Sequence, residues 1–104
     1  VGLGGVLVEV LADVAIRTIP CRRAEVAAML DQLKGAPILD GVRGRAGADK
    51  EALVEAILRL AQLLAEYPVI REIDLNPVAA LPLGAGLLAL DARVVVVVKG
   101  EVEP

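Results

Sequence analysis

The 104-residue sequence contains no histidine, no tryptophan and no phenylalanine, and it has a single cysteine. Without imidazole, the chain cannot supply a Ser-His-Asp or Cys-His arrangement, a histidine metal ligand or a histidine phosphate carrier. Zinc sites are built mainly from cysteine and histidine, so this composition does not suit zinc. Any metal ion bound by these residues must therefore be held by oxygen atoms.

Other absences bear on location and partners. The lone Cys21 excludes a disulfide within the chain and is compatible with a reducing cytoplasm. No apolar run approaches the roughly 18 residues of a membrane-spanning helix, and no stretch has the pattern of a cleaved leader. A net charge of −3, without basic clusters or aromatic platforms, argues against a nucleic-acid surface. We therefore expect a cytoplasmic protein that binds neither membranes nor nucleic acid.

The residues that are present favour one small domain with an aliphatic core. Hydrophobic residues make up 57% of the chain, and Tyr67 is the only aromatic residue. A chain of this length forms one domain at most. We expect that domain to span residues 1–98, with the charged residues 99–104 as a tail.

Hydrophobic periodicity divides the chain into strands and two helices. The helix expected over residues 50–67 is the clearest, because Asp49 is a good N-cap and polar residues recur in one narrow stripe. A second helix is expected over residues 22–34. The remaining segments are expected as strands at residues 6–11, 13–20, 69–76 and 94–98, a loop at 35–47 and a hairpin at 78–90. This order predicts an α+β fold in which two helices cover a mixed or antiparallel sheet.

The segment E-I-D-L-N-P, residues 72–77, is followed by L-D-A-R at residues 90–93. Asp74 and Asn76 are two positions apart on a strand, so their side chains project from the same face. A turn near residues 84–86 would bring Asp91 and Arg93 opposite Asn76. Amide and carboxylate oxygens on paired strands suit Mg²⁺, which commonly takes one or two carboxylates together with water and substrate phosphate.

Several features leave alternatives open. Glu9 is a single carboxylate in an otherwise apolar strand, and it belongs either to a site or to a solvated edge. Arg43 and Arg45 are flanked by glycines, so they either reach an anionic ligand or lie in a solvated loop. A purely structural role also fits Asp74, Asn76 and Asp91, because Asp and Asn at strand ends often cap turns.

The glycine-led opening G-L-G-G-V-L-V-E-V, the loop motif G-V-R-G, and then E-I-D-L-N-P and L-D-A-R together resemble a known family. They are similar to the C-terminal part of the ATP-grasp domain of NDP-forming acyl-CoA synthetases, which include ADP-forming acetyl-CoA synthetase and succinyl-CoA synthetase. The resemblance runs from Gly2 to about Val95. It implies an ATP-grasp C-terminal subdomain that binds ATP or ADP, with Asn76 and Asp91 as Mg²⁺ ligands. By the same resemblance, Glu9, Asp74 and Arg93 belong to the nucleotide and phosphate pocket.

The resemblance also implies a reaction and partners. The family interconverts acyl-CoA, ADP and phosphate with acid, CoA and ATP, through an acyl phosphate and a phosphohistidine. Because this chain has no histidine, the phosphohistidine must lie in a CoA-binding domain or subunit of the same enzyme, and we expect an oligomer in the full-length form. The first ATP-grasp subdomain is also missing and the sequence starts without methionine. We therefore expect a fragment that is inactive alone.

Two other functions compete with this one. ATP-grasp-like modules fused to a protein acetyltransferase domain resemble the same family and would sense a ligand without turnover. A structural α+β domain without chemistry is the other alternative.

Overall fold

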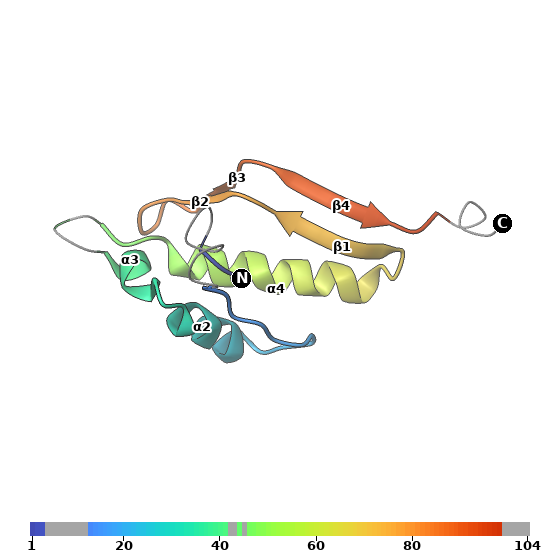
Figure 1. The fold of residues 1–104 in the computed structure, drawn as a ribbon, viewed down its shortest axis with the longest axis horizontal. Helices are drawn as coiled ribbons and strands as arrows, with labels where there is room; N and C mark the ends of the chain where they lie inside the picture. Colours follow the sequence, from blue (N-terminus) through green and yellow to red (C-terminus); the bar gives the residue numbers. More distant parts are fainter. Residues whose placement is uncertain (4–12, 42–43, 45, 99–104) are drawn as a thin grey trace.

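The computed structural model describes residues 1–3, 13–41, 44 and 46–98. Three helices precede four strands along this part of the chain (Figure 1). They are α2 (Arg23–Gln32), α3 (Ala36–Asp40), α4 (Lys50–Glu66), β1 (Ile70–Leu75), β2 (Val78–Ala80), β3 (Leu87–Ala89) and β4 (Ala92–Val96). None of these helices is long and apolar enough to cross a membrane.

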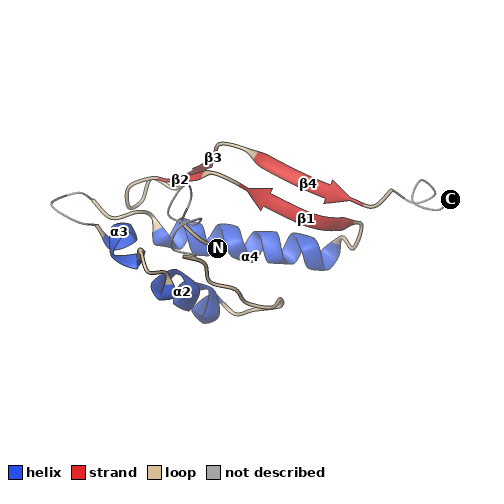
Figure 2. Cartoon of the chain, in the orientation of Figure 1, coloured by secondary structure: helices blue, strands red, loops and turns tan. Residues whose placement is uncertain are grey.

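The four strands form one long antiparallel ribbon. β1 pairs with β4, and β2 pairs with β3 at the hairpin end, as the sequence predicts. Figure 2 shows α4 lying along this ribbon and α2 lying on the other side of α4. Packing follows the same order, because α4 contacts both β1 and α2. The predicted α+β class with antiparallel strands is confirmed.

The core lies mainly between α2 and α4. Val26 and Leu30, four positions apart on α2, are 0% and 1% exposed. That spacing places both side chains on one helix face, which is the face turned to α4. Met29 is buried beside them, as expected for a residue that fills the core. The other buried apolar residues are Ala15, Leu33, Leu39 and Val54.

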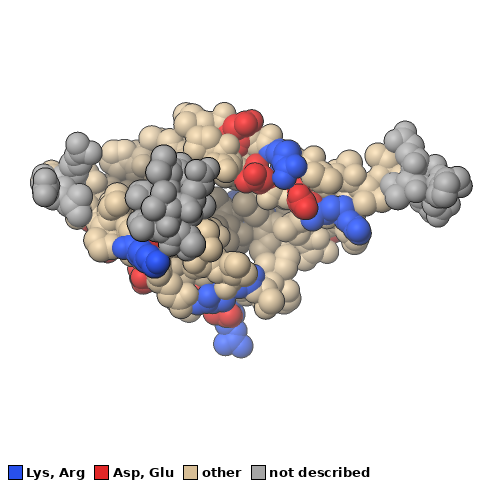
Figure 3. Space-filling view, viewed as in Figure 1, with Lys and Arg blue, Asp and Glu red and all other residues tan. Residues whose placement is uncertain are grey.

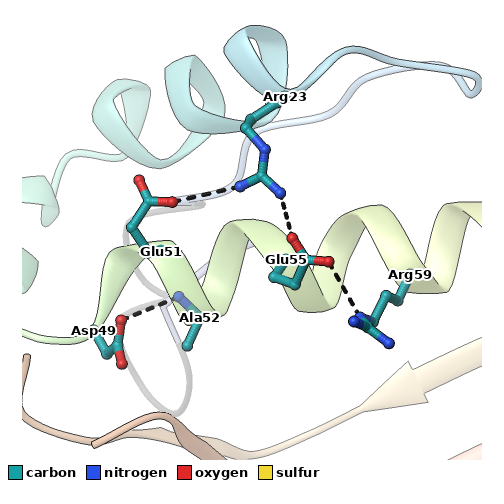
Figure 4. A network of polar contacts seen from close by, with 6 residues as sticks. All are labelled: Arg23, Asp49, Glu51, Ala52, Glu55 and Arg59. Atoms are coloured by element: carbon teal, nitrogen blue, oxygen red, sulfur yellow. Dashed lines mark hydrogen bonds and ion pairs between the residues drawn. The ribbon is translucent and has the colours of Figure 1, made fainter. Parts of the chain in front are cut away.

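The N-terminus of α4 and the polar residues along its exposed face agree with the sequence-based prediction. The Asp49 carboxylate accepts a hydrogen bond from the Ala52 N–H at 3.1 Å, which confirms the predicted N-cap. Glu55 pairs with Arg59 at 3.2 Å, one turn further along the same helix. Arg23 of α2 reaches across to both Glu51 and Glu55, so these polar side chains tie the two helices together (Figure 4).

The Arg23–Glu55 contact predicts a pH dependence of stability. The hydrogen bond from Arg23 holds the pKa of Glu55 below its ordinary value of 4.5, with a smaller contribution from Arg59. A lowered folded-state pKa gives stabilisation that is complete above the ordinary pKa and is lost as the pH falls through the folded value. Between about pH 6 and pH 3, Tm should fall more steeply for the wild type than for Glu55→Gln. Parallel declines of Tm in the two proteins would contradict this assignment.

One of the predicted strands does not form in the structure. Residues 13–20 do not form a strand; their strand-like contact is an isolated bridge between Gly2 and Val14. The reason is Asp13, whose buried carboxylate accepts hydrogen bonds from the backbone N–H groups of Lys34 and Gly35 and so anchors the segment at the α2–α3 junction. The strand predicted at residues 6–11 lies outside the described residues.

The predicted loop at residues 35–47 contains helix α3. Proline is tolerated in a first helical turn, where its missing N–H would have no partner in the helix. Pro37 occupies that position in α3, and Gly41, with φ +101°, caps the C-terminal end of the helix. The Gly- and Pro-rich composition therefore marks the two ends of a short helix as well as a loop.

Candidate functional site

The candidate site lies on the ribbon between the β1–β4 and β2–β3 ladders. Asp74 pairs with Arg93 and Leu75 with Ala92, and the same register continues at Val78 and Ala89. Residues 76 and 91 therefore lie across from each other. The Asn76 N–H donates to the Asp91 carbonyl oxygen at 3.1 Å, which shows the contact directly. The predicted opposition of these two segments is confirmed.

One face of the ribbon presents the polar residues of both motifs. Asp74 and Arg93 are directly opposed, so their side chains share a face, and strand alternation places Asn76 and Asp91 on that same face. All four side chains are exposed. Acidic and basic side chains gather over the β1–β4 part of the ribbon in Figure 3. The ribbon thus separates a polar face from an apolar one.

The apolar face of β1 holds the ribbon on α4. Ile73 and Leu75 alternate with the polar residues and are half-buried, whereas Glu72 and Asp74 are exposed. β1 contacts α4 through this side. A one-residue slip of register would turn the polar set toward α4 and the apolar set to solvent, so packing fixes which side chains face outward.

The oxygen atoms at the gap between the ladders fit Mg²⁺. One Asp91 oxygen accepts from the Ala92 N–H at 2.9 Å, which orients the carboxylate and leaves its second oxygen available. Within the described residues, the Asn76 side-chain amide makes no hydrogen bond. Nor does this part of the chain gather three or more Asp, Glu, Cys or His residues able to enclose a metal. A pair of oxygen ligands is the arrangement that Mg²⁺ uses when substrate phosphate completes its coordination.

Charge on this face also favours a cation. Glu72, Asp74 and Asp91 supply three carboxylates against the guanidinium groups of Arg93 and of Arg71, the exposed residue at the irregularity in β1, which leaves a net charge of −1. Arg93 pairs with Glu72 at 3.4 Å, but both side chains are about two-thirds exposed, so the ion pair is weak. A free phosphate would therefore meet repulsion here, whereas a divalent cation or its phosphate complex would be attracted.

Two sets of predicted residues lie outside the described part of the chain. They are Glu9, which was expected in the pocket, and the loop arginines Arg43 and Arg45. Sequence reasoning also missed one contact near the site. The second oxygen of Asp49 accepts a hydrogen bond from the Gly86 N–H at 2.8 Å, at the turn of the β2–β3 hairpin. The N-cap pattern in the sequence predicted the contact of Asp49 with the first turn of α4. Gly86 is 37 positions further along the chain, so no local pattern could predict its contact with Asp49.

Comparison with known proteins identifies the wider family. The profile of the ATP-grasp domain matches residues 1–96. The β subunit of the ADP-forming acetate–CoA ligase II of Pyrococcus furiosus is 41% identical over 95 residues, which cover 90% of this chain and 40% of that subunit. A trans-feruloyl-CoA synthase from an unknown prokaryotic organism is 47% identical over 95 residues, covering 91% of this chain and 13% of that protein.

A solved structure of a related enzyme has the same fold as this chain. The dinucleotide-forming acetyl-coenzyme A synthetase 1 of Candidatus Korarchaeum cryptofilum superposes with a TM-score of 0.84 at 38% identity, over 92% of this chain and 44% of that one. That protein was solved with coenzyme A and Mg-AMPPCP, with its phosphohistidine segment pointing towards the nucleotide binding site. The present chain thus spans less than half the length of these relatives. Its sequence match over residues 1–96 and its shared fold show that the chain belongs to the ATP-grasp domain family.

Proposed function

We propose that this chain is the nucleotide- and magnesium-binding half of an NDP-forming acyl-CoA synthetase. The enzyme would interconvert acyl-CoA, ADP and phosphate with acid, CoA and ATP. Residues 1–98 would form the C-terminal ATP-grasp subdomain, and residues 99–104 a tail. The observation that supports this most is the opposition of Asn76 and Asp91 on one ribbon face, in a chain similar to ADP-forming acid–CoA ligases.

The polar residues of this ribbon face would have different roles in binding the metal ion and the phosphate. Asn76 and Asp91 would hold the magnesium ion through their side-chain oxygens. A magnesium ion held there would offset negative charge on the transferring phosphoryl group. Arg93 would exchange its exposed partner Glu72 for a phosphate oxygen. Asp74, opposite Arg93, would attract the guanidinium and keep it on this face of the ribbon.

Partners follow from what the chain does not contain. Its 104 residues have no histidine, so a phosphohistidine would come from a CoA-binding domain or subunit of the same enzyme. We keep an oligomeric full-length form and a cytoplasmic location as predictions from the sequence. Glu9 also remains a predicted pocket residue.

Acyl-CoA-dependent formation of ATP tests the proposed function. The intact protein that contains this chain, supplied with ADP, phosphate and either acetyl-CoA or feruloyl-CoA, should form ATP, and EDTA should abolish the reaction. The isolated 104-residue chain should form none, because it lacks a phosphate-carrying histidine. ATP can be followed by luciferase luminescence.

Two other results would change this proposal in different ways. Turnover by the isolated chain would show that these residues are a whole catalytic site and not half of one. An intact protein that binds Mg-ADP but forms no ATP from either thioester would support the ligand-sensing alternative instead.

A further inference from the structure

Asp49 is a buried carboxylate that joins two parts of the fold. It is 8% exposed, and its two oxygens have different partners. One accepts from the Ala52 N–H at 3.1 Å and caps α4. The other accepts from the Gly86 N–H at 2.8 Å, in the turn between β2 and β3. A capping residue needs only the first contact, so the second calls for its own explanation.

Backbone contacts beside Asp49 hold the same turn. The Asp49 N–H donates to the Leu81 carbonyl at 2.8 Å, and the Leu83 N–H donates to the Gly47 carbonyl at 3.0 Å. Between them, Ala48 and Pro82 form an antiparallel bridge. The segment before α4 therefore runs along the hairpin, and the Asp49 side chain fastens it at Gly86. The base of α4 and the hairpin turn form one unit.

This hairpin lies between the two proposed metal ligands. β2 starts two residues after Asn76, and β3 ends two residues before Asp91. The β2–β3 ladder has only three residue pairs. Its position therefore depends on what holds its turn, and a shift of the hairpin would alter the spacing of both ligands.

We infer that Asp49 is a positioning residue for the metal site. By holding the Gly86 turn against the start of α4, it fixes the hairpin whose two ends present Asn76 and Asp91. This inference rests on the proposed function, since it takes those two residues as the magnesium ligands. Outer residues that orient metal ligands commonly affect metal affinity about 10- to 100-fold.

Two substitutions separate the helix cap from the hairpin contact. Serine is as good an N-cap as aspartate, but its shorter side chain has no second oxygen at the place from which Asp49 reaches Gly86. In the intact protein, Asp49→Ser should therefore retain the Tm of the wild type more closely than Asp49→Ala does. Both variants should raise the Kd of Mg-ADP about tenfold, as measured by isothermal titration calorimetry. The Kd of ADP in EDTA should stay unchanged.

The outcomes discriminate between positioning and simple stabilisation. If Asp49→Ser binds Mg-ADP like the wild type while Asp49→Ala loses Tm, Asp49 is only a helix cap and the inference is overturned. In an Asp91→Ala background, Asp49→Ser should add no further loss of affinity; a full additional tenfold loss would show that Asp49 does not act through this site. If Asp91→Ala itself leaves the Kd of Mg-ADP unchanged, the proposed function fails, and this inference fails with it.

Discussion

Replacing Asp91 with alanine should weaken Mg-ADP binding to the intact protein by about 100-fold. The substitution removes one of two proposed ligand groups and leaves Asn76 alone at the gap between the ladders. It also removes one negative charge from the ribbon face. Isothermal titration calorimetry with Mg-ADP measures the loss directly.

For nucleotide without metal, charge predicts that Asp91→Ala does not weaken binding. ADP in EDTA should bind Asp91→Ala no more weakly than it binds the wild type, because the removed carboxylate would repel its phosphates. Asp31→Ala is the matched control. It removes an exposed carboxylate on α2, and its partner Lys50 keeps Asp40 at 2.9 Å. Equal Mg-ADP affinity in the wild type and Asp91→Ala would eliminate Asp91 as a ligand.

Replacing Leu30 with alanine should reduce the free energy of unfolding by about 2–5 kcal/mol. Leu30 is 1% exposed and lies in the α2–α4 core, so its truncation removes apolar contacts and leaves a cavity. The core holds only seven buried apolar residues within the described part of the chain, which gives little capacity to compensate. Urea unfolding followed by circular dichroism measures the change.

Ile38→Ala is the control for core truncation. Ile38 lies in α3 and is 55% exposed, so its loss should change stability by about 0.5 kcal/mol or less. Comparable losses of stability in Ile38→Ala and Leu30→Ala would contradict the placement of the core between α2 and α4.

Much of the site geometry was predictable because its signals are local. Alternation of polar and apolar residues assigned Asp74 and Asn76 to one face, and the glycines at 84 and 86 located the hairpin turn. Both glycines have φ of +84°, a backbone conformation that favours glycine. Together these signals placed residues 91–93 opposite Asn76, and the structure gives the exact pairing of Asn76 with Asp91.

The missed features depend on contacts between distant residues. Asp13 reaches the α2–α3 junction about twenty positions away, and this contact outweighs the strand-like pattern of residues 13–20. The second contact of Asp49 is of the same kind. The strand expected at residues 94–98 forms as part of β4, which is exposed along its length.

The position of the metal ion tests the central proposal most directly. Crystals of the intact protein grown with Mn²⁺ and ADP would locate the ion by its anomalous scattering. We predict a peak within about 2.0–2.3 Å of an Asn76 side-chain oxygen and an Asp91 carboxylate oxygen, with ADP phosphate completing the coordination. A nucleotide-bound Mn²⁺ peak coordinated by other residues, with Asn76 and Asp91 out of reach, would contradict it.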